Sequence, residues 1–244
     1  MDPADPFDRA ARRRQQRRAV PGFLHAAMAE EVAARVTAAG RGFDLALDIG
    51  GTGVRGRVAT WALDVAPRPG VAVVADPDRL PVADGSVDLI AAFGLHAAGD
   101  LPGALILARR ALAPGGLFVA ALPGGASLAE LRADLLAAEV ALTGRAAARV
   151  MPTVDPAAAP ALLQRAGFAD PVVEVDRLTV RYADPWGLLR DLRTAGEGNI
   201  LSAREPLRRD VLADAARRFA ARADGRVAVT AEILYLTGWR GAAG

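Results

Sequence analysis

The chain has 244 residues, of which 52% are hydrophobic, and this length favours one core domain with an added element. It contains no cysteine and only two histidines, which excludes disulfides, a thiol nucleophile and any thiolate or histidine-rich metal site. The formal net charge is only +2, and no apolar run approaches the ~20 residues of a membrane-spanning helix.

The N-terminal segment is rich in arginine and precedes the expected core. Its arginines are Arg9, Arg12, Arg13, Arg14, Arg17 and Arg18. The simplest interpretation is a solvated helix, and the alternative is a patch for an acidic partner or for peripheral contact with a membrane surface. No aromatic residue interleaves the arginines, so we expect no nucleic-acid partner. Because the segment has no apolar stretch of a signal peptide, we expect a cytoplasmic protein. We predict a basic helical segment over 1–42 and the main domain over 43–244.

The first half of the chain alternates helices with apolar strands. Helical spacing predicts a helix over Phe23–Ala39 that ends at Gly40 and another over Leu101–Leu112. Strands are expected over 45–49, 58–65, 71–75, from residue 87, and over 117–122. Such alternation predicts a mostly parallel sheet in an α/β sandwich.

The second half adds more helices and two long strands. A helix is expected over Ser127–Leu142, with Ser127 as N-cap and Glu130 completing a capping box. Further helices are expected over 157–166, 185–195 and 206–223, and strands over 171–182 and 227–239. The helices at about 184–223 would form a cap on the main domain.

Several strings in a fixed order resemble those of a known family. They are "FDRAARRRQQRRA", "VVADPDRLPVADGSVDLI", "LHAAGDLPGAL", "SLAELRADLLAAE", "DLRTAGEGN" and "AEILYLTGW". The sequence resembles class I S-adenosylmethionine-dependent methyltransferases. Within them it is most similar to the complex I assembly factor 5 proteins, which are arginine-hydroxylase-like, and to the malonyl-carrier-protein methyltransferases of biotin synthesis. The resemblance implies a Rossmann-like seven-strand sheet with an antiparallel last strand, and S-adenosylmethionine as cofactor.

The first loop departs from the family pattern. The family has three glycines at alternate positions after the first strand, whereas this chain has Asp48, Gly50, Gly51 and Gly53. The helix that should follow is missing, because a strand begins near Val58. Parallel neighbours need a crossover of about a dozen residues, so we expect 58–65 to pair antiparallel to 45–49. A helix N-terminus would supply N–H donors and positive charge, so we expect weak or lost cofactor binding.

The resemblance also implies site residues. Asp64 would hold the ribose hydroxyls and Asp76 the adenine amine, although Asp64 could also be an ordinary turn aspartate. His96 lies where the family places its cofactor and is a catalytic candidate or a structural remnant. Asp100 is most simply a helix N-cap. No metal ligands are expected.

The "GEGN" string at Gly196–Asn199 suggests a substrate site. If the target is an arginine of an iron–sulfur subunit of complex I, a carboxylate must hold its guanidinium, and Glu197 is the candidate. Asn199 could bond the target's backbone. The alternative is that Gly196 only ends a helix.

Two other functions compete with this one. The fold could serve as a cofactor-free scaffold or assembly chaperone. "DIGGT" at 48–52 is also typical of actin-like sugar kinases, where it turns between antiparallel strands and cradles phosphate. The second phosphate loop and second lobe of such kinases are not found.

Overall fold

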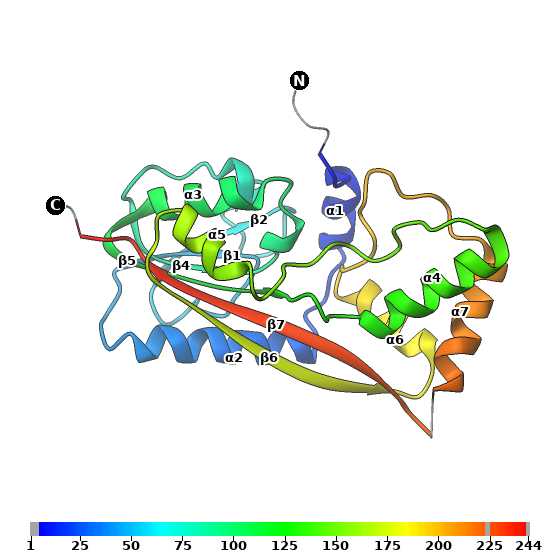
Figure 1. The fold of residues 1–244 in the computed structure, drawn as a ribbon. Coiled ribbons are helices and arrows are strands. Elements are labelled where there is room, and N and C mark those ends of the chain that lie inside the picture. The colour runs from blue at the N-terminus through cyan, green and yellow to red at the C-terminus, as the bar shows by residue number, and fades with distance from the viewer. Residues whose placement is uncertain (1–4, 223–224, 243–244) are drawn as a thin grey trace. The chain divides into compact units, whose positions relative to one another are not determined.

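The computed structural model describes residues 5–222 and 225–242, and the chain divides into two units. Unit 1 comprises residues 1–20, 124–153 and 177–232. Unit 2 comprises residues 21–123, 154–176 and 233–244. Both units are therefore assembled from separate stretches of the chain, which Figure 1 colours in sequence order.

A seven-stranded sheet contains all strands of the described residues, in the order β3-β2-β1-β4-β5-β7-β6. The strands are β1 (Leu45–Ile49), β2 (Ala59–Asp64), β3 (Val73–Val74), β4 (Val87–Ala92), β5 (Leu112–Pro123), β6 (Ala169–Tyr182) and β7 (Val227–Trp239). The pairs from β3 to β5 are parallel, and β7 runs antiparallel to β5. This confirms the predicted class I methyltransferase-like α/β fold with an antiparallel last strand.

The connection from β1 to β2 contains no helix, as the sequence predicted. The residues between Ile49 and Ala59 form turns and an isolated bridge between Arg55 and Val58. The expected antiparallel hairpin is wrong, because β1 and β2 pair in parallel with Leu45 opposite Ala59. The loop makes this crossover with fewer residues than the dozen or so that a helical crossover requires. Trp61 on β2 is consequently 45% exposed, since no crossover helix covers it.

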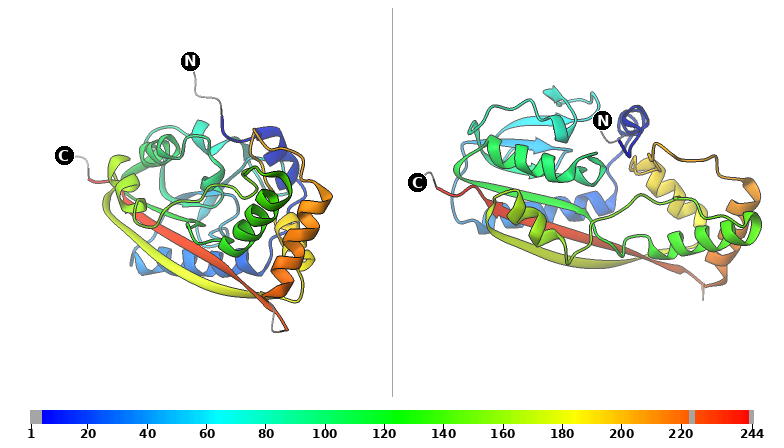
Figure 2. Two further views of the ribbon diagram at one scale, coloured as in Figure 1. Left: turned by 45° about the vertical axis from the view of Figure 1, so that its right-hand side comes forward. Right: turned by 45° about the horizontal axis from the view of Figure 1, so that its top comes forward.

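Helices pack on both faces of the sheet in unit 2. α2 (Phe23–Ala38) lies on one face, and α3 (Leu101–Ala111) and α5 (Ala159–Arg165) lie on the other (Figures 1 and 2). The core between the sheet and α3 and α5 contains Leu47, Leu63, Ile90, Leu105, Phe118, Leu163 and Leu234. Asp100 accepts a hydrogen bond from Gly103 N at 2.9 Å, which confirms that it caps α3. Short 3₁₀ turns, η1 (Pro77–Arg79) and η2 (Leu95–Ala97), follow β3 and β4.

Unit 1 is built mainly from helices. They are α1 (Arg9–Gln16), α4 (Ala129–Thr143), α6 (Pro185–Thr194) and α7 (Arg209–Ala221). Figure 2 shows α4 and α7 side by side. Their small apolar core contains Leu131, Leu135, Leu188, Val211, Phe219 and Val229. Among the residues that the structure describes, no helix is long and apolar enough to cross a membrane.

The start of α4 differs from the predicted capping box. Leu128 is the N-cap, with a φ of 56°, and its side chain makes no capping bond. Ser127 Oγ instead donates to Glu232 O at 2.6 Å, and Glu130 accepts from Thr230 N at 3.0 Å. Two side chains that could cap a helix are therefore used to fix it to β7, which a local pattern does not reveal.

Candidate functional site

A glycine turn follows β1 at the carboxyl end of the strand. Gly50 has a φ of 76°, and a Cβ there would lie 3.0 Å from Phe93 O, so only glycine fits. Gly50 N donates to Leu63 O at 2.9 Å, which ties the turn to the end of β2. Gly51 and Gly53 also have positive φ, and a Cβ on Gly51 would meet nothing within 4 Å. The turn is thus closed toward β4 and open at Gly51.

Asp48 holds this turn in shape from the end of β1. Its side chain is fully buried, and Oδ1 accepts from Thr52 N at 2.7 Å and from Thr52 Oγ1 at 2.9 Å. Oδ2 is buried without a hydrogen-bond partner among the described residues. Arg55 Nε lies 3.5 Å from Oδ2 and provides a countercharge. A buried carboxylate needs such a charge because desolvation is costly.

Asp64 ends β2 and is also paired within the chain. It is 5% exposed, accepts from Ala66 N at 3.2 Å and forms an ion pair with Arg68 in the loop after β2. Asp76 is half-buried and directly precedes η1, where it makes no side-chain capping bond. The carboxyl ends of β1 and β2 therefore present one acid each, and each acid faces an arginine of its own loop.

Both histidines belong to unit 2, and one of them contacts the glycine turn. His25 on α2 lies with Nε2 2.8 Å from Gly51 O, and its ring meets the Phe93 ring edge-on at 5.0 Å. A carbonyl only accepts hydrogen bonds, so Nε2 must carry the proton. His96 lies half-buried in η2 after β4. The contact of His25 with the glycine turn was not predicted, because α2 is separated from that turn in sequence. The only signal in the sequence was that a helix containing His25 directly precedes the first strand.

The predicted substrate residues belong to unit 1. Glu197 Oε1 accepts from Arg12 Nη1 at 3.0 Å and from Gln16 Nε2 at 3.4 Å. Asn199 Oδ1 accepts from Leu201 N at 2.9 Å, and its Nδ2 donates to Ala148 O at 3.4 Å. Both side chains have structural partners, so the substrate role stays a prediction.

Gly196 ends α6, which agrees with the helix-stop interpretation of "GEGN". Its φ is 73°, and Glu197 N donates back to Leu192 O at 2.8 Å. A Cβ at Gly196 would lie 2.9 Å from Ala19 Cβ, because α1 packs against this turn. The string therefore has a structural function in unit 1.

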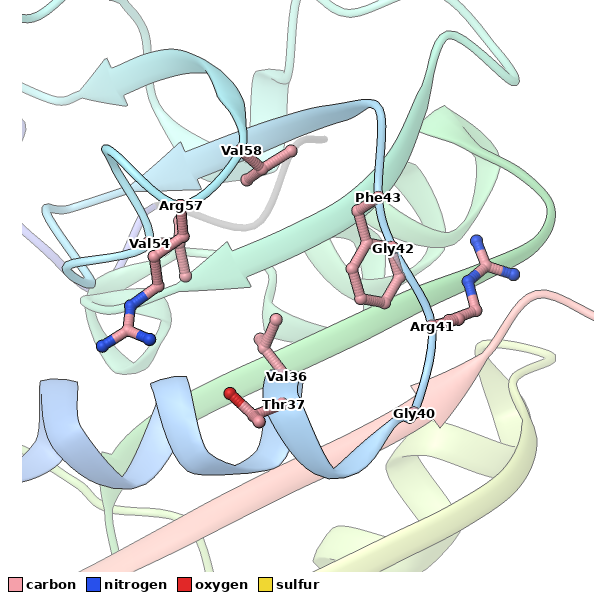
Figure 3. A pocket seen from close by; sticks show the side chains of 9 residues that line it. All are labelled: Val36, Thr37, Gly40, Arg41, Gly42, Phe43, Val54, Arg57 and Val58. Carbon is pink, nitrogen blue, oxygen red and sulfur yellow. The ribbon is translucent and has the colours of Figure 1, made fainter.

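A hollow of about 480 Å³ lies elsewhere in unit 2. Figure 3 shows its lining between the end of α2 and the β1–β2 connection, with Val36, Phe43, Val54 and Val58. Phe43 precedes β1 and Val58 precedes β2, so the hollow lies at the amino ends of these strands. It contains none of the predicted site residues, and we attribute it to the missing crossover helix.

Comparisons with known proteins agree with this architecture. The family described as "Methyltransferase domain" matches residues 42–120. The arginine-hydroxylase NDUFAF5 of Danio rerio is 32% identical over 266 residues, covering 96% of this chain and 82% of that protein. The human protein of that name is also 32% identical, with 96% and 76% covered. A malonyl-[acyl-carrier protein] O-methyltransferase of Methylovorus is 33% identical over 173 residues, covering 69% of this chain and 56% of the relative.

The structural comparison concerns the fold alone. The crystal structure of the YcgJ protein from Bacillus subtilis has a TM-score of 0.59 at 13% identity and covers 88% of this chain and 99% of that one. The NDUFAF5 relatives match almost the whole chain. The sheet order and the antiparallel β7 also agree with the fold that the resemblance implied. The family assignment therefore covers both units. This chain belongs to the class I methyltransferase superfamily of enzymes, together with the arginine-hydroxylase NDUFAF5 proteins.

Proposed function

We propose that this protein binds S-adenosylmethionine weakly at the carboxyl ends of β1 and β2 and acts on an arginine side chain of a protein partner. The carrying observation is the glycine turn, which is open at Gly51 and held by the buried Asp48. In open α/β sheets, ligands bind at the carboxyl ends of the strands. The parallel pairing of β1 and β2 argues against the sugar-kinase alternative, which needs "DIGGT" between antiparallel strands.

The residues at these strand ends fit this cofactor, although an arginine of the chain competes for one of its proposed contacts. Asp64 stands at the end of β2, where a carboxylate can accept hydrogen bonds from ribose hydroxyls. Arg68 occupies that carboxylate, so binding must displace or share an ion pair. Asp76 would accept from the adenine amine, and the backbone of Gly50–Gly53 would line the cofactor. When bound, S-adenosylmethionine supplies an electrophilic methyl group on a sulfonium centre.

The substrate class comes from the relatives, which are named arginine-hydroxylases. An iron–sulfur subunit of complex I is our proposed partner. The Arg12–Glu197 pair illustrates that Glu197 can accept a guanidinium, and a target arginine would have to replace Arg12 there. Asn199 is the candidate for bonding the target's backbone, and His96 of unit 2 is a catalytic candidate beside the cofactor loops. Mass spectrometry of the modified partner would distinguish methyl transfer from hydroxylation.

A second function is favoured by the same ion pairs. Because Arg55 and Arg68 face the acids of the cofactor loops, the protein could serve as a cofactor-free assembly scaffold. Calorimetric titration with S-adenosylmethionine separates the two functions. We expect the parent protein to bind with a Kd of about 0.1–1 mM.

Two variants test the role of the ion pair. Asp64→Ala should abolish binding. Arg68→Gln should tighten binding about five- to tenfold, because the ribose hydroxyls no longer compete with Arg68 for the Asp64 carboxylate. Arg110→Gln is the matched control, since Arg110 pairs with Asp84 on the exposed surface of unit 2. Thermal melts verify folding of each variant. Absence of binding in both the parent and Arg68→Gln would favour the scaffold.

A further inference from the structure

The C-terminal ends of α1 and α6 lie side by side within unit 1. Val20 N, just after α1, donates to Thr194 O at 2.8 Å, and Gln16 Nε2 donates to Gly196 O at 3.1 Å. Gly198 N also donates to Gln15 Oε1 at 3.1 Å. These bonds fix the exposed side chains of both helix ends to one region of unit 1, and Figure 1 labels the two helices.

One face of α6 combines an aromatic ring with positive charge. Trp186, Arg190 and Arg193 are spaced four and three residues apart, so they lie along the same face of the helix. All three are exposed, and Trp186 is 49% accessible. The opposite side of α6 buries Leu188 in the core of unit 1. A large aromatic ring therefore faces solvent beside two arginines.

The outer face of α1 continues this charge. Arg12 and Gln16 are buried against the end of α6, whereas Arg14, Arg17 and Arg18 are exposed. Val20 follows them and is 59% exposed. We define the basic surface by these residues of both helices: Arg14, Arg17, Arg18, Val20, Trp186, Arg190 and Arg193.

The two acids that contact α1 from its ends form their ion pairs with arginines outside the basic surface. Asp8 caps α1 and pairs with Arg204, and Glu197 pairs with Arg12 beneath the surface. None of the ion pairs within residues 5–222 and 225–242 includes an arginine of the basic surface, and the one acid whose pKa such an arginine helps to lower is Asp8, near Arg14. The positive charge of the basic surface is therefore presented to an external anion.

We infer that the basic surface docks the protein onto an anionic lipid bilayer. Arginines grouped on helices attract acidic headgroups, and an exposed tryptophan suits the boundary between headgroups and acyl chains. Arginine stems can also lie along the apolar layer while their guanidinium groups stay among phosphates. A lipid surface accounts for Val20 and Trp186 as well as for the charge, whereas a polyanion such as RNA accounts for the charge alone. The inference does not depend on the proposed cofactor site.

Vesicle flotation of the full chain tests the docking. The vesicles contain phosphatidylcholine with or without phosphatidylglycerol at about one part in three, in about 0.15 M salt. We expect binding only to the anionic vesicles. Replacing Arg14, Arg17, Arg190 and Arg193 by glutamine should lower the partition coefficient at least about 100-fold, since each arginine near such a surface contributes about fivefold.

A matched variant controls for net charge. Arg79, Arg165, Arg209 and Arg226 are exposed and lie outside the basic surface, and their replacement by glutamine removes the same charge. We expect this control to keep binding within about fivefold of the parent. A variant with Trp61→Phe and Trp239→Phe keeps Trp186 as its tryptophan, and its fluorescence should shift to the blue on anionic vesicles. A circular dichroism melt of each variant verifies folding.

Three results would overturn the docking. The parent could fail to float with anionic vesicles, both sets of glutamine substitutions could weaken binding equally, or the Trp186 emission could stay unchanged on bound vesicles. Tighter binding to a short RNA or to polyglutamate than to vesicles of equal charge would assign the basic surface to another partner and also reject the proposal.

Discussion

Unit 2 has a large core of apolar side chains in and around the sheet, whereas unit 1 joins its helices with many arginine–carboxylate pairs. Tyr235, Phe118 and Leu47 are among the most completely buried side chains of unit 2. In unit 1 the Arg149–Glu139 pair has both side chains only 7% exposed, and Arg222 pairs with Asp134. Burial of apolar side chains stabilises a protein independently of charge and of exact geometry, but a buried ion pair stabilises it only while both members are charged. The two units should therefore fail under different perturbations.

The largest effect is expected from a cavity in unit 2. Phe118 is fully buried and stacks on Phe168 with ring centroids 4.9 Å apart. Phe118→Ala should lower the free energy of unfolding by about 3–5 kcal/mol because it removes apolar contacts and leaves a cavity. Hydrogen exchange with mass spectrometry should show lost protection in β4 and β5. Phe23→Ala, at a site 57% exposed, is the control and should change stability by less than about 0.5 kcal/mol. Equal loss in both variants would contradict the core described for unit 2.

A smaller effect is expected from breaking the buried pair of unit 1. Glu139→Gln leaves the Arg149 guanidinium buried without its countercharge and should cost about 3 kcal/mol. Exchange should increase in α4 and α7. Asp84→Asn in unit 2 removes an ion pair whose side chains are more than half exposed, and it should cost less than about 1 kcal/mol. If the two variants are equally stable, ion pairing does not distinguish the units.

The smallest effect is a difference in acid sensitivity. Among the described residues, the surroundings lower the pKa of these carboxyl groups, all of unit 1: Asp8, Glu130, Glu139, Asp210, Asp214 and Glu232. The hydrogen bonds from Arg149 are the main cause of the lowered pKa of Glu139, and the backbone N–H of Ala126 is the main cause for Glu232.

A lowered folded pKa gives stability that is present above the unfolded pKa of about 4.3 and is lost as the pH falls through the folded value. Unit 1 should thus lose exchange protection before unit 2 as the pH falls from about 5 to about 3. Glu139→Gln should show a smaller pH dependence than the parent, because it removes one of the titrating groups. Loss of protection at one common pH in both units would contradict the comparison.

Sequence reasoning was most successful where a pattern is local. The apolar strands from Leu45 and Val87, the alternating strand at Val227–Trp239 and the N-cap Asp100 were predicted because each depends on a few neighbouring residues. The missing crossover helix was predicted from the short interval between two strands.

Sequence reasoning failed where distant residues decide the structure. Parallel pairing of β2 was not predicted, because it depends on how a loop returns across β1. Ser127 and Glu130 bind β7 residues about 100 positions later, so the predicted capping box does not form. The arginines facing Asp48 and Asp64 lie close in sequence, but surface arginines are too common in this chain for their pairing to be inferred.

The packing of α1 against the end of α6 has a consequence for biosynthesis. Arg12 bonds to Gly196 O across 184 positions, so α1 has no docking site until α6 and the turn after it have been synthesised. Contacts of such separation form late, because a long loop must close before they stabilise anything. During translation the arginine-rich N-terminus is therefore available to chaperones and to nearby surfaces before unit 1 exists. The order of synthesis itself gives the side of α1 that carries Arg12 and Gln16 a period of exposure, whereas both side chains are buried in the finished protein.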